Sequence, residues 1–163
     1  MPSLGEINAM DSTTAHTLFK RCTIATQYCD ALVNSRPYLT LDELMSASDT
    51  ATHELNLQSL LTAFSGHPRI GERKGHSTWS STEQSGLSAD DAKTLEDLAS
   101  ANLAYESKFN HVFLICATGK TGSEMLKECN RRIKNSPEVE IQEAREQLRL
   151  INQIRIQKLL EEI

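Results

Sequence analysis

The amino-acid sequence predicts an all-α protein, a single helical domain of about seven to nine helices over residues 1–163. Apolar residues recur at three-and-four spacing along most of the chain, which is the period of an α-helix. Helix-capping residues precede several of these runs. One segment, 108–116, has a strand-like composition, and the sequence offers no second strand for it to pair with.

The first half of the chain divides into three predicted helices. Asp11 with its following serine is suited to cap the first. The second is expected over about 22–33, and it must end before Pro37. Thr40, with a glutamate three residues later, has the pattern of a capping box. From there, one long helix is expected to run to Gly66.

The second half begins with a polar segment, 68–79, whose length is typical of a functional surface loop. Ser88 is expected to cap the next helix, again with an acidic residue three positions on. The strand-like segment 108–116 is interpreted as extended or helical chain within an all-α domain. Two further helices are expected, over about 123–134 and from Pro137 to near the end.

Composition excludes several kinds of partner. The formal net charge is −5, and acidic and basic residues are mixed, so no basic patch is available for nucleic acid. The longest apolar run, 112–117, is too short to span a membrane. The first residues lack the features of a secretory signal, so a cytoplasmic protein is expected. The four cysteines form no Cys-x-x-Cys pair and are expected to be buried, reduced thiols.

A histidine lies where the backbone must leave the helical conformation. His67 precedes Pro68, so the helix that ends at Gly66 cannot continue through it. Sixteen residues later, Glu83 and Gln84 follow a Ser/Thr-rich run. An imidazole and a carboxylate that meet in the fold are able to carry out acid–base chemistry without a metal.

Each of these residues also has a purely structural interpretation. A histidine at a helix C-terminus complements the helix dipole whatever else it does. Ser80 and Glu83 together fit a capping box, in which the glutamate only bonds back to the cap residue. A glutamine such as Gln84 is more often a solvated surface residue than a ligand.

Arg155 lies within the apolar face of the last predicted helix. That face is formed at helical period by Ile141, Ala144, Leu148, Ile151 and Leu159. A guanidinium does not lose its proton, so one that faces the core needs an anionic partner or a bound anionic ligand. The alternative is an arginine that reaches the edge of the core or pairs with a carboxylate of the chain.

Two motifs that suggest other chemistry are incomplete. Gly119-Lys120-Thr121 resembles the end of a phosphate-binding loop, but the glycine that the loop needs five residues earlier is Leu114. His53-Glu54 begins a zinc-protease pattern, but its second histidine would fall at Leu57. We therefore predict neither a nucleotide site, a metal site nor an organic cofactor.

Several motifs occur in one order along nearly the whole chain, from about 8 to 160. They are His67-Pro68, the Ser/Thr-rich run into Glu83-Gln84, Asn102-x-x-Tyr105-x-x-Lys108-Phe109, the segment 112–120, and a final helix with Glu140, Ala144 and Arg155-Ile156. Together they resemble the 2-oxo-4-hydroxy-4-carboxy-5-ureidoimidazoline (OHCU) decarboxylases of urate breakdown. The likeness departs from the usual pattern at Arg69-Ile70-Gly71-Glu72 and at Asn110.

The resemblance implies an all-helical homodimer that uses no metal or cofactor and converts OHCU to (S)-allantoin. It implies that His67 and Glu83 are the catalytic pair. It further implies that substrate is bound by Pro68, Ser80, Gln84 and Arg155, and by the backbone of Ile115, Cys116, Ala117, Thr118 and Gly119, whose amide and carbonyl groups would stay free for it. An alternative stays open at this point: a different cofactor-free lyase or isomerase on the same scaffold, acting on a small anionic ureido or ring substrate.

Overall fold

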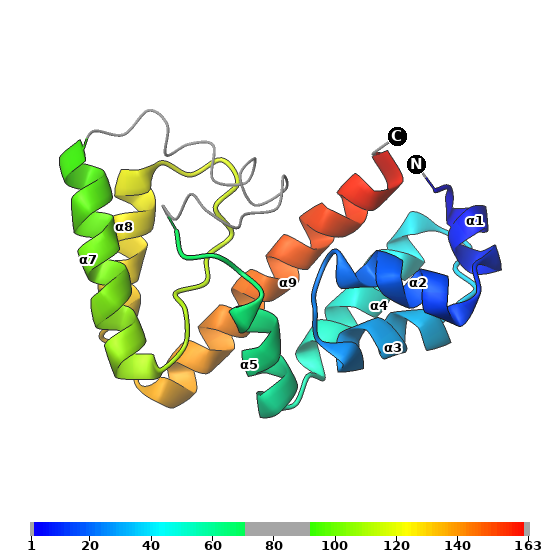
Figure 1. The fold of residues 1–163 in the computed structure, drawn as a ribbon, viewed down its shortest axis with the longest axis horizontal. Coiled ribbons are helices and arrows are strands. Elements are labelled where there is room, and N and C mark those ends of the chain that lie inside the picture. The colour runs from blue at the N-terminus through cyan, green and yellow to red at the C-terminus, as the bar shows by residue number, and fades with distance from the viewer. Residues whose placement is uncertain (1, 71–91, 162–163) are drawn as a thin grey trace. The chain divides into compact units, whose positions relative to one another are not determined.

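The computed structural model describes residues 2–70 and 92–161, and all the regular structure within those ranges is helical (Figure 1). Eight helices lie there, which confirms the predicted all-α class. The chain groups into two units, a terminal unit (Met1–Gly66 with Leu148–Ile163) and a central unit (His67–Gln147). The single-domain organisation stays a prediction.

Five helices and the end of a sixth form the terminal unit. They are α1 (Leu4–Ala9), α2 (Ser12–Lys20), α3 (Thr26–Asn34), α4 (Leu41–His53), α5 (Leu57–Ser65) and the last part of α9 (Pro137–Glu161). The side chains of Asp11 and Thr40 cap α2 and α4 as predicted. Helix α1, capped by Ser3, was not predicted, and it is only six residues long.

Two helix boundaries differ from the prediction. Helix α3 begins at Thr26 and not near residue 22. The long helix expected up to Gly66 is two helices, because Asn56 accepts a hydrogen bond from the amide of Ser59 and so starts α5. Gln27 stabilises the break from a distance, since its side chain bonds the amide of Asn56 and the carbonyl of Glu54, each at 3.1 Å.

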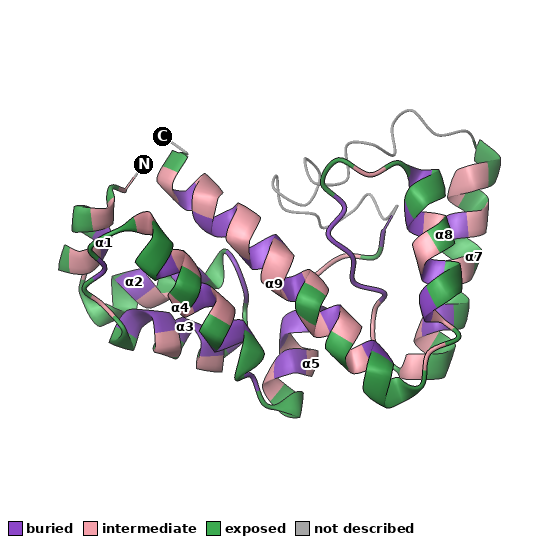
Figure 2. Cartoon of the chain, turned by 180° about the vertical axis from the view of Figure 1, so that it is seen from behind, coloured by how far each residue is buried: buried purple, intermediate pink, exposed green. Residues whose placement is uncertain are grey.

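The core of the terminal unit lies where α2, α3 and α4 pack in succession and where the end of α9 joins them. Figure 2 shows buried residues recurring along one side of α9. The predicted apolar face is confirmed in this unit at Leu148, Ile151 and Leu159. In the part of α9 that belongs to the central unit, Ala144 is buried and Ile141 is only partly buried. Buried Asn152 on the same helix bonds Thr23 and Thr52, so this core also contains a satisfied polar group.

The central unit contains α7 (Ala92–Phe109), α8 (Gly122–Arg132) and the first part of α9. Helices α7 and α8 lie side by side (Figure 1). Helix α7 ends at Phe109, and the next residue, Asn110, has a φ of 61°, the left-handed conformation that asparagine tolerates after helix ends. The strand-like segment is therefore helical up to 109 and irregular from 110 to 121. The proposed cap Ser88 lies outside the described residues.

Candidate functional site

His67 directly follows Gly66, the residue that ends α5, as the sequence predicts. Gly66 is the C-cap of α5, and its amide bonds the carbonyl of Ala63 at 3.2 Å. His67 and Pro68 are both half-buried. Because His67 directly follows the negative end of a helix dipole, its position favours the protonated imidazole.

The residues that follow His67 are attached to α7. Arg69 Nε lies 2.7 Å from Glu106 Oε1, and the Asn102 side-chain amide donates to the carbonyl of Ile70 at 3.0 Å. The ion pair is partly exposed, so it contributes no more than about 1 kcal/mol. Ile70 is buried in the core of the central unit, and this packing fixes the position of the chain just after His67.

That core also contains alternate residues of the irregular segment. Its buried members are Ile70, Leu98, Tyr105, Phe113, Ile115, Ala117, Met125 and Cys129. Phe113, Ile115 and Ala117 belong to it, whereas Leu114 and Cys116 are buried but lie outside this cluster. A period of two is typical of extended chain. Residues 113–117 therefore pass through the central unit in an extended conformation, with Ile70 in the same cluster.

Three side chains bind the backbone of this extended segment. Arg132 Nη1 donates to the Leu114 carbonyl at 2.8 Å, and Gln147 Oε1 accepts from the Cys116 amide at 2.9 Å. Lys120 Nζ donates to the Cys116 carbonyl at 2.7 Å. The expectation that the backbone of 115–119 stays free is thus wrong for Cys116, because side chains of the protein already satisfy both of its backbone groups.

A tight turn joins the extended segment to α8. The Lys120 amide bonds the Ala117 carbonyl at 3.0 Å, and Gly119 adopts a φ of +78° that favours glycine. Thr121 caps α8 in a complete capping box with Glu124. Thr121 and Lys120, the residues that resembled a phosphate-binding loop, are therefore used to end this turn and to begin a helix.

A buried ion pair lies behind the extended segment. Arg132 Nε is 3.0 Å from both carboxylate oxygens of Glu140, and Tyr105 donates its hydroxyl to Glu140 Oε2 at 2.6 Å. Burial, together with the hydrogen bond to Glu140, raises the pKa of Tyr105 well above its ordinary value. The guanidinium also lies 4.6 Å from the centre of the Phe113 ring.

Sequence reasoning selected Tyr105 and Glu140 only as residues of the family resemblance, and it missed Arg132. A signal was available, because Met125, Cys129 and Arg132 share one face of α8 at helical spacing, and all three are buried. Lys108, another residue of the resemblance, donates to the carbonyls of Ile133 and Asn135. Tyr105, Arg132 and Glu140 thus form the hydrogen-bonded group beside the extended segment, and Lys108 binds the chain just after α8.

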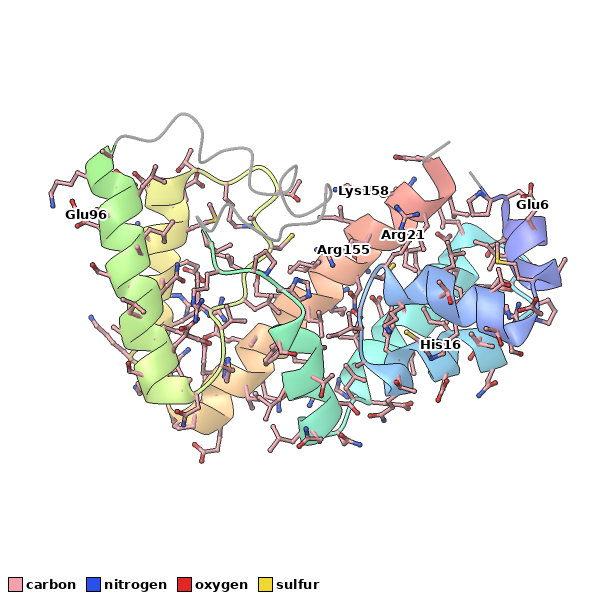
Figure 3. All side chains as sticks on the ribbon, in the orientation of Figure 1. Glu6, His16, Arg21, Glu96, Arg155 and Lys158 are labelled. Atoms are coloured by element: carbon pink, nitrogen blue, oxygen red, sulfur yellow. The ribbon has the colours of Figure 1, made fainter. Side chains whose placement is uncertain are left out.

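Arg155 lies in the terminal unit and is buried, with 7% of its surface exposed. Its Nη1 donates to the carbonyl of Cys22 at 3.1 Å. Figure 3 shows Arg21 and Lys158 in the same region of this unit; Arg21 directly precedes Cys22, and Lys158 is one helical turn beyond Arg155. Three cationic side chains therefore lie in this region of the terminal unit.

Glu83, Ser80 and Gln84 lie outside the described residues, so the proposed pair of His67 with Glu83 stays a prediction. Within the described residues, no group of three or more His, Cys, Asp or Glu side chains is arranged to hold a metal ion. In the same part of the chain, no helix combines the length and the apolar character that crossing a membrane requires. All four cysteines are buried and unpaired with one another, as the sequence predicts.

The fold and these groups define a class: an all-α protein that holds a histidine at a helix end, an extended backbone segment and a buried arginine. The family model of OHCU decarboxylase matches residues 8–157. A crystal structure of an OHCU decarboxylase in the presence of (S)-allantoin aligns with a TM-score of 0.77 at 32% sequence identity, covering 88% of this chain and 97% of that one. The chain belongs to the OHCU decarboxylase family.

Curated relatives carry the same domain in different contexts. The uric acid degradation bifunctional protein TTL of Arabidopsis thaliana is 30% identical over 148 residues, which are 86% of this chain but only 46% of that protein. An OHCU decarboxylase of Xenopus laevis is 27% identical, over 85% of this chain and 81% of the relative. That of Haloferax volcanii is 25% identical, over 76% and 74% respectively.

Proposed function

We propose that this chain decarboxylates OHCU to (S)-allantoin in the breakdown of urate. The observation that carries the proposal is the family match over residues 8–157, which includes every residue that the sequence singled out for the chemistry. The likeness to an OHCU decarboxylase structure with (S)-allantoin supports it. In the central unit, one core contains both Ile70, three residues after His67, and alternate residues of the extended segment, and this arrangement supports a substrate site near them.

The proposed reaction needs no organic cofactor, because the C=N bond of the substrate accepts the electron pair that CO₂ loss releases. Loss of CO₂ from the hydroxyl-bearing carbon releases an electron pair into the adjacent C=N bond of the ring. The ring nitrogen takes up a proton, and the resulting enol becomes allantoin when the neighbouring carbon receives a proton and the hydroxyl group releases one. Delivery of that proton to one face of the ring produces the (S) centre.

His67 is proposed to deliver that proton. The end of α5 favours the charged imidazole, and Pro68 fixes the backbone beside it. Glu83 is proposed to orient the ring and to stabilise its positive charge. Pairs of a histidine and a carboxylate carry out acid–base catalysis at neutral pH in many enzymes.

The substrate's charge and polar arms are assigned to the other residues. Arg155 is proposed to bind the carboxylate, and the neighbouring cations Arg21 and Lys158 favour the same charge. Ser80 and Gln84 are proposed to hydrogen-bond the ring or the ureido arm, with Pro68 packing against it. Backbone groups of 115–119, other than those of Cys116 and the Ala117 carbonyl, are proposed to complete the contacts.

The test supplies fresh OHCU, made in situ from urate with urate oxidase and hydroxyisourate hydrolase, and follows (S)-allantoin by circular dichroism. We expect a rapid signal that EDTA does not reduce. We expect His67→Ala to abolish the acceleration while the thermal midpoint stays within a few degrees, and His53→Ala, at an exposed histidine, to leave the rate unchanged. A folded sample that does not accelerate the reaction would refute the function, and near-normal activity of His67→Ala would refute the role of His67.

We also propose that the protein is a homodimer located in the cytoplasm. The dimer is an expectation from the family resemblance, and sedimentation velocity at micromolar concentration tests it, with a single monomeric species as the contrary result. Four buried cysteines without a disulfide are compatible with a reducing compartment. Localisation of a tagged chain by microscopy tests that part.

A further inference from the structure

The bond between Gln147 and Cys116 connects α9 to the extended segment inside the central unit. Gln147 is only half-buried, and its Oε1 accepts the Cys116 amide at 2.9 Å. Removing the acceptor of an amide in a buried segment costs free energy, because the amide loses a hydrogen bond that water replaces poorly there. Residues 112–117 belong to no helix or strand, so secondary structure of the segment itself does not supply the acceptor for this amide.

The side-chain bonds to the extended segment involve residues of one parity, whereas the Ala117 carbonyl, at the end of the segment, accepts from the Lys120 amide in the turn that follows. The side chains of Arg132, Gln147 and Lys120 bind the backbone groups of residues 114 and 116. In extended chain, the amide and carbonyl groups of alternate residues point to the same edge, and those of the residues between them point to the opposite edge. One edge of the segment is therefore bound to the protein, and Ile115 directs its backbone groups to the other edge.

We propose that Gln147 is a positioning residue for substrate recognition. By holding the Cys116 amide, it fixes the rotation of the extended segment and thereby the direction in which the Ile115 backbone groups point. It does not touch the substrate, and it acts through the segment. This inference rests on the proposed function, and it adds a residue that the sequence analysis did not select.

Gln147 is a better probe of this role than the other two side chains. Arg132 also belongs to the buried ion pair, so its removal affects folding. Lys120 acts within its own turn. Gln147→Met keeps the length of the side chain and removes the strong acceptor, whereas Gln147→Glu keeps an acceptor. Gln142→Met is the matched control, since Gln142 is exposed on the same helix and bonds Arg145.

The experiment measures kcat and KM with in-situ OHCU, and hydrogen exchange of the Cys116 amide by NMR. For Gln147→Met we expect KM to rise about tenfold with kcat within about twofold, as for a lost binding interaction. We also expect faster exchange of the Cys116 amide. In Gln147→Glu this amide should exchange as slowly as in the unmodified chain, and Gln142→Met should change neither KM nor exchange.

The outcomes separate the two proposals. If the unmodified chain is active and Gln147→Met has an unchanged KM, the positioning role is wrong and the function stands. A lower kcat and a lower thermal midpoint with an unchanged KM would also overturn it, since that is the result of a structural role alone. If the unmodified chain shows no turnover, the proposed function fails, and the positioning role fails with it.

Discussion

Arg132 and Glu140 form an ion pair inside the central unit in which both side chains are almost completely buried, at 1% and 0% exposure. It connects the end of α8 to the start of α9, and Arg132 extends the connection to the Leu114 carbonyl. Tyr105 adds α7 through its hydroxyl. One buried carboxylate thus holds together three helices and the extended segment.

Removal of one partner of this ion pair is expected to destabilise the folded protein strongly. Arg132→Met should lower the free energy of unfolding by about 3–5 kcal/mol, because it leaves the Glu140 carboxylate buried without its counter-charge. Urea denaturation followed by circular dichroism measures the loss. Arg131→Met is the control, since neighbouring Arg131 pairs with Glu128 and Glu143 at the surface, where a cost of at most about 1 kcal/mol is expected.

The double variant Arg132→Met, Glu140→Leu tests the origin of that loss. An apolar pair of similar volume carries no unpaired charge, so the double variant should be more stable than Arg132→Met alone by at least about 1 kcal/mol. A double variant that is less stable than either single variant would contradict this explanation.

Gly119 is expected to be sensitive to substitution for a reason of backbone conformation alone. Gly119→Ala should cost about 1 kcal/mol, because φ is +78° while a Cβ there would meet nothing within 4 Å. Gly119→Asn should cost less, since asparagine tolerates this region. Gly5→Ala is the opposite control. Gly5 lies in a helix with room for a Cβ, so its replacement by alanine should stabilise the protein. Equal effects of Gly119→Ala and Gly119→Asn would argue against backbone strain.

Two buried thiols are expected to make the protein less stable in alkali. Burial raises the pKa of Cys29 and of Cys129 to about 11 from an ordinary value of 9.0. Below pH 9 the folded and unfolded chains both keep these protons. Between about pH 9 and 11 only the unfolded chain releases them, so the free energy of unfolding should fall as pH rises.

Denaturation by urea at several pH values measures that slope. Replacing Cys29 and Cys129 together by alanine should flatten it, even though the variant starts from a lower stability. Native protein should also react slowly with a thiol reagent at pH 8, and all four thiols should react in urea. An unchanged slope in the double variant would assign the alkaline loss to other groups.

Arg155 is expected to affect both binding and packing. Arg155→Met should raise KM for OHCU about 10- to 100-fold, as for a lost hydrogen-bonded charge, and should lower stability because the Cys22 carbonyl loses a donor. Arg155→Lys keeps the charge without the planar fork, so an intermediate KM is expected. Arg149→Met, on the same helix with Asp49 as its partner, should leave KM unchanged. An unchanged KM in Arg155→Met would remove Arg155 from the substrate site.

Local signals in the sequence predicted most helices because capping is a short-range interaction. Asp11 and Thr40 bind amides three residues away, and the proline at 68 prevents α5 from continuing through His67. The same local reasoning joined α4 to α5, since both halves have helical spacing. It failed there because Gln27, 29 residues from Asn56, satisfies the backbone groups that the break exposes.

The extended segment shows the other limit of local reasoning. Its composition is that of a strand, yet within the described residues it pairs with no strand, and side chains of two helices and of its own turn bind its backbone. Nothing in the segment itself identifies Arg132 or Gln147 as partners. Such pairings depend on how three helices pack, and a hydrophobic period shows only which face is buried.

By itself, the sequence determined the all-α class, the main helix caps, the place of His67 at a helix end and the resemblance to one family, because each depends on neighbouring residues or on motif order. Only the tertiary structure decided that Arg132 pairs with Glu140, that Arg155 binds the Cys22 carbonyl and that Gln147 holds Cys116. Those contacts join residues that are distant in the chain or in separate elements. Burial makes them necessary, since each polar group removed from water needs a partner that packing brings to it.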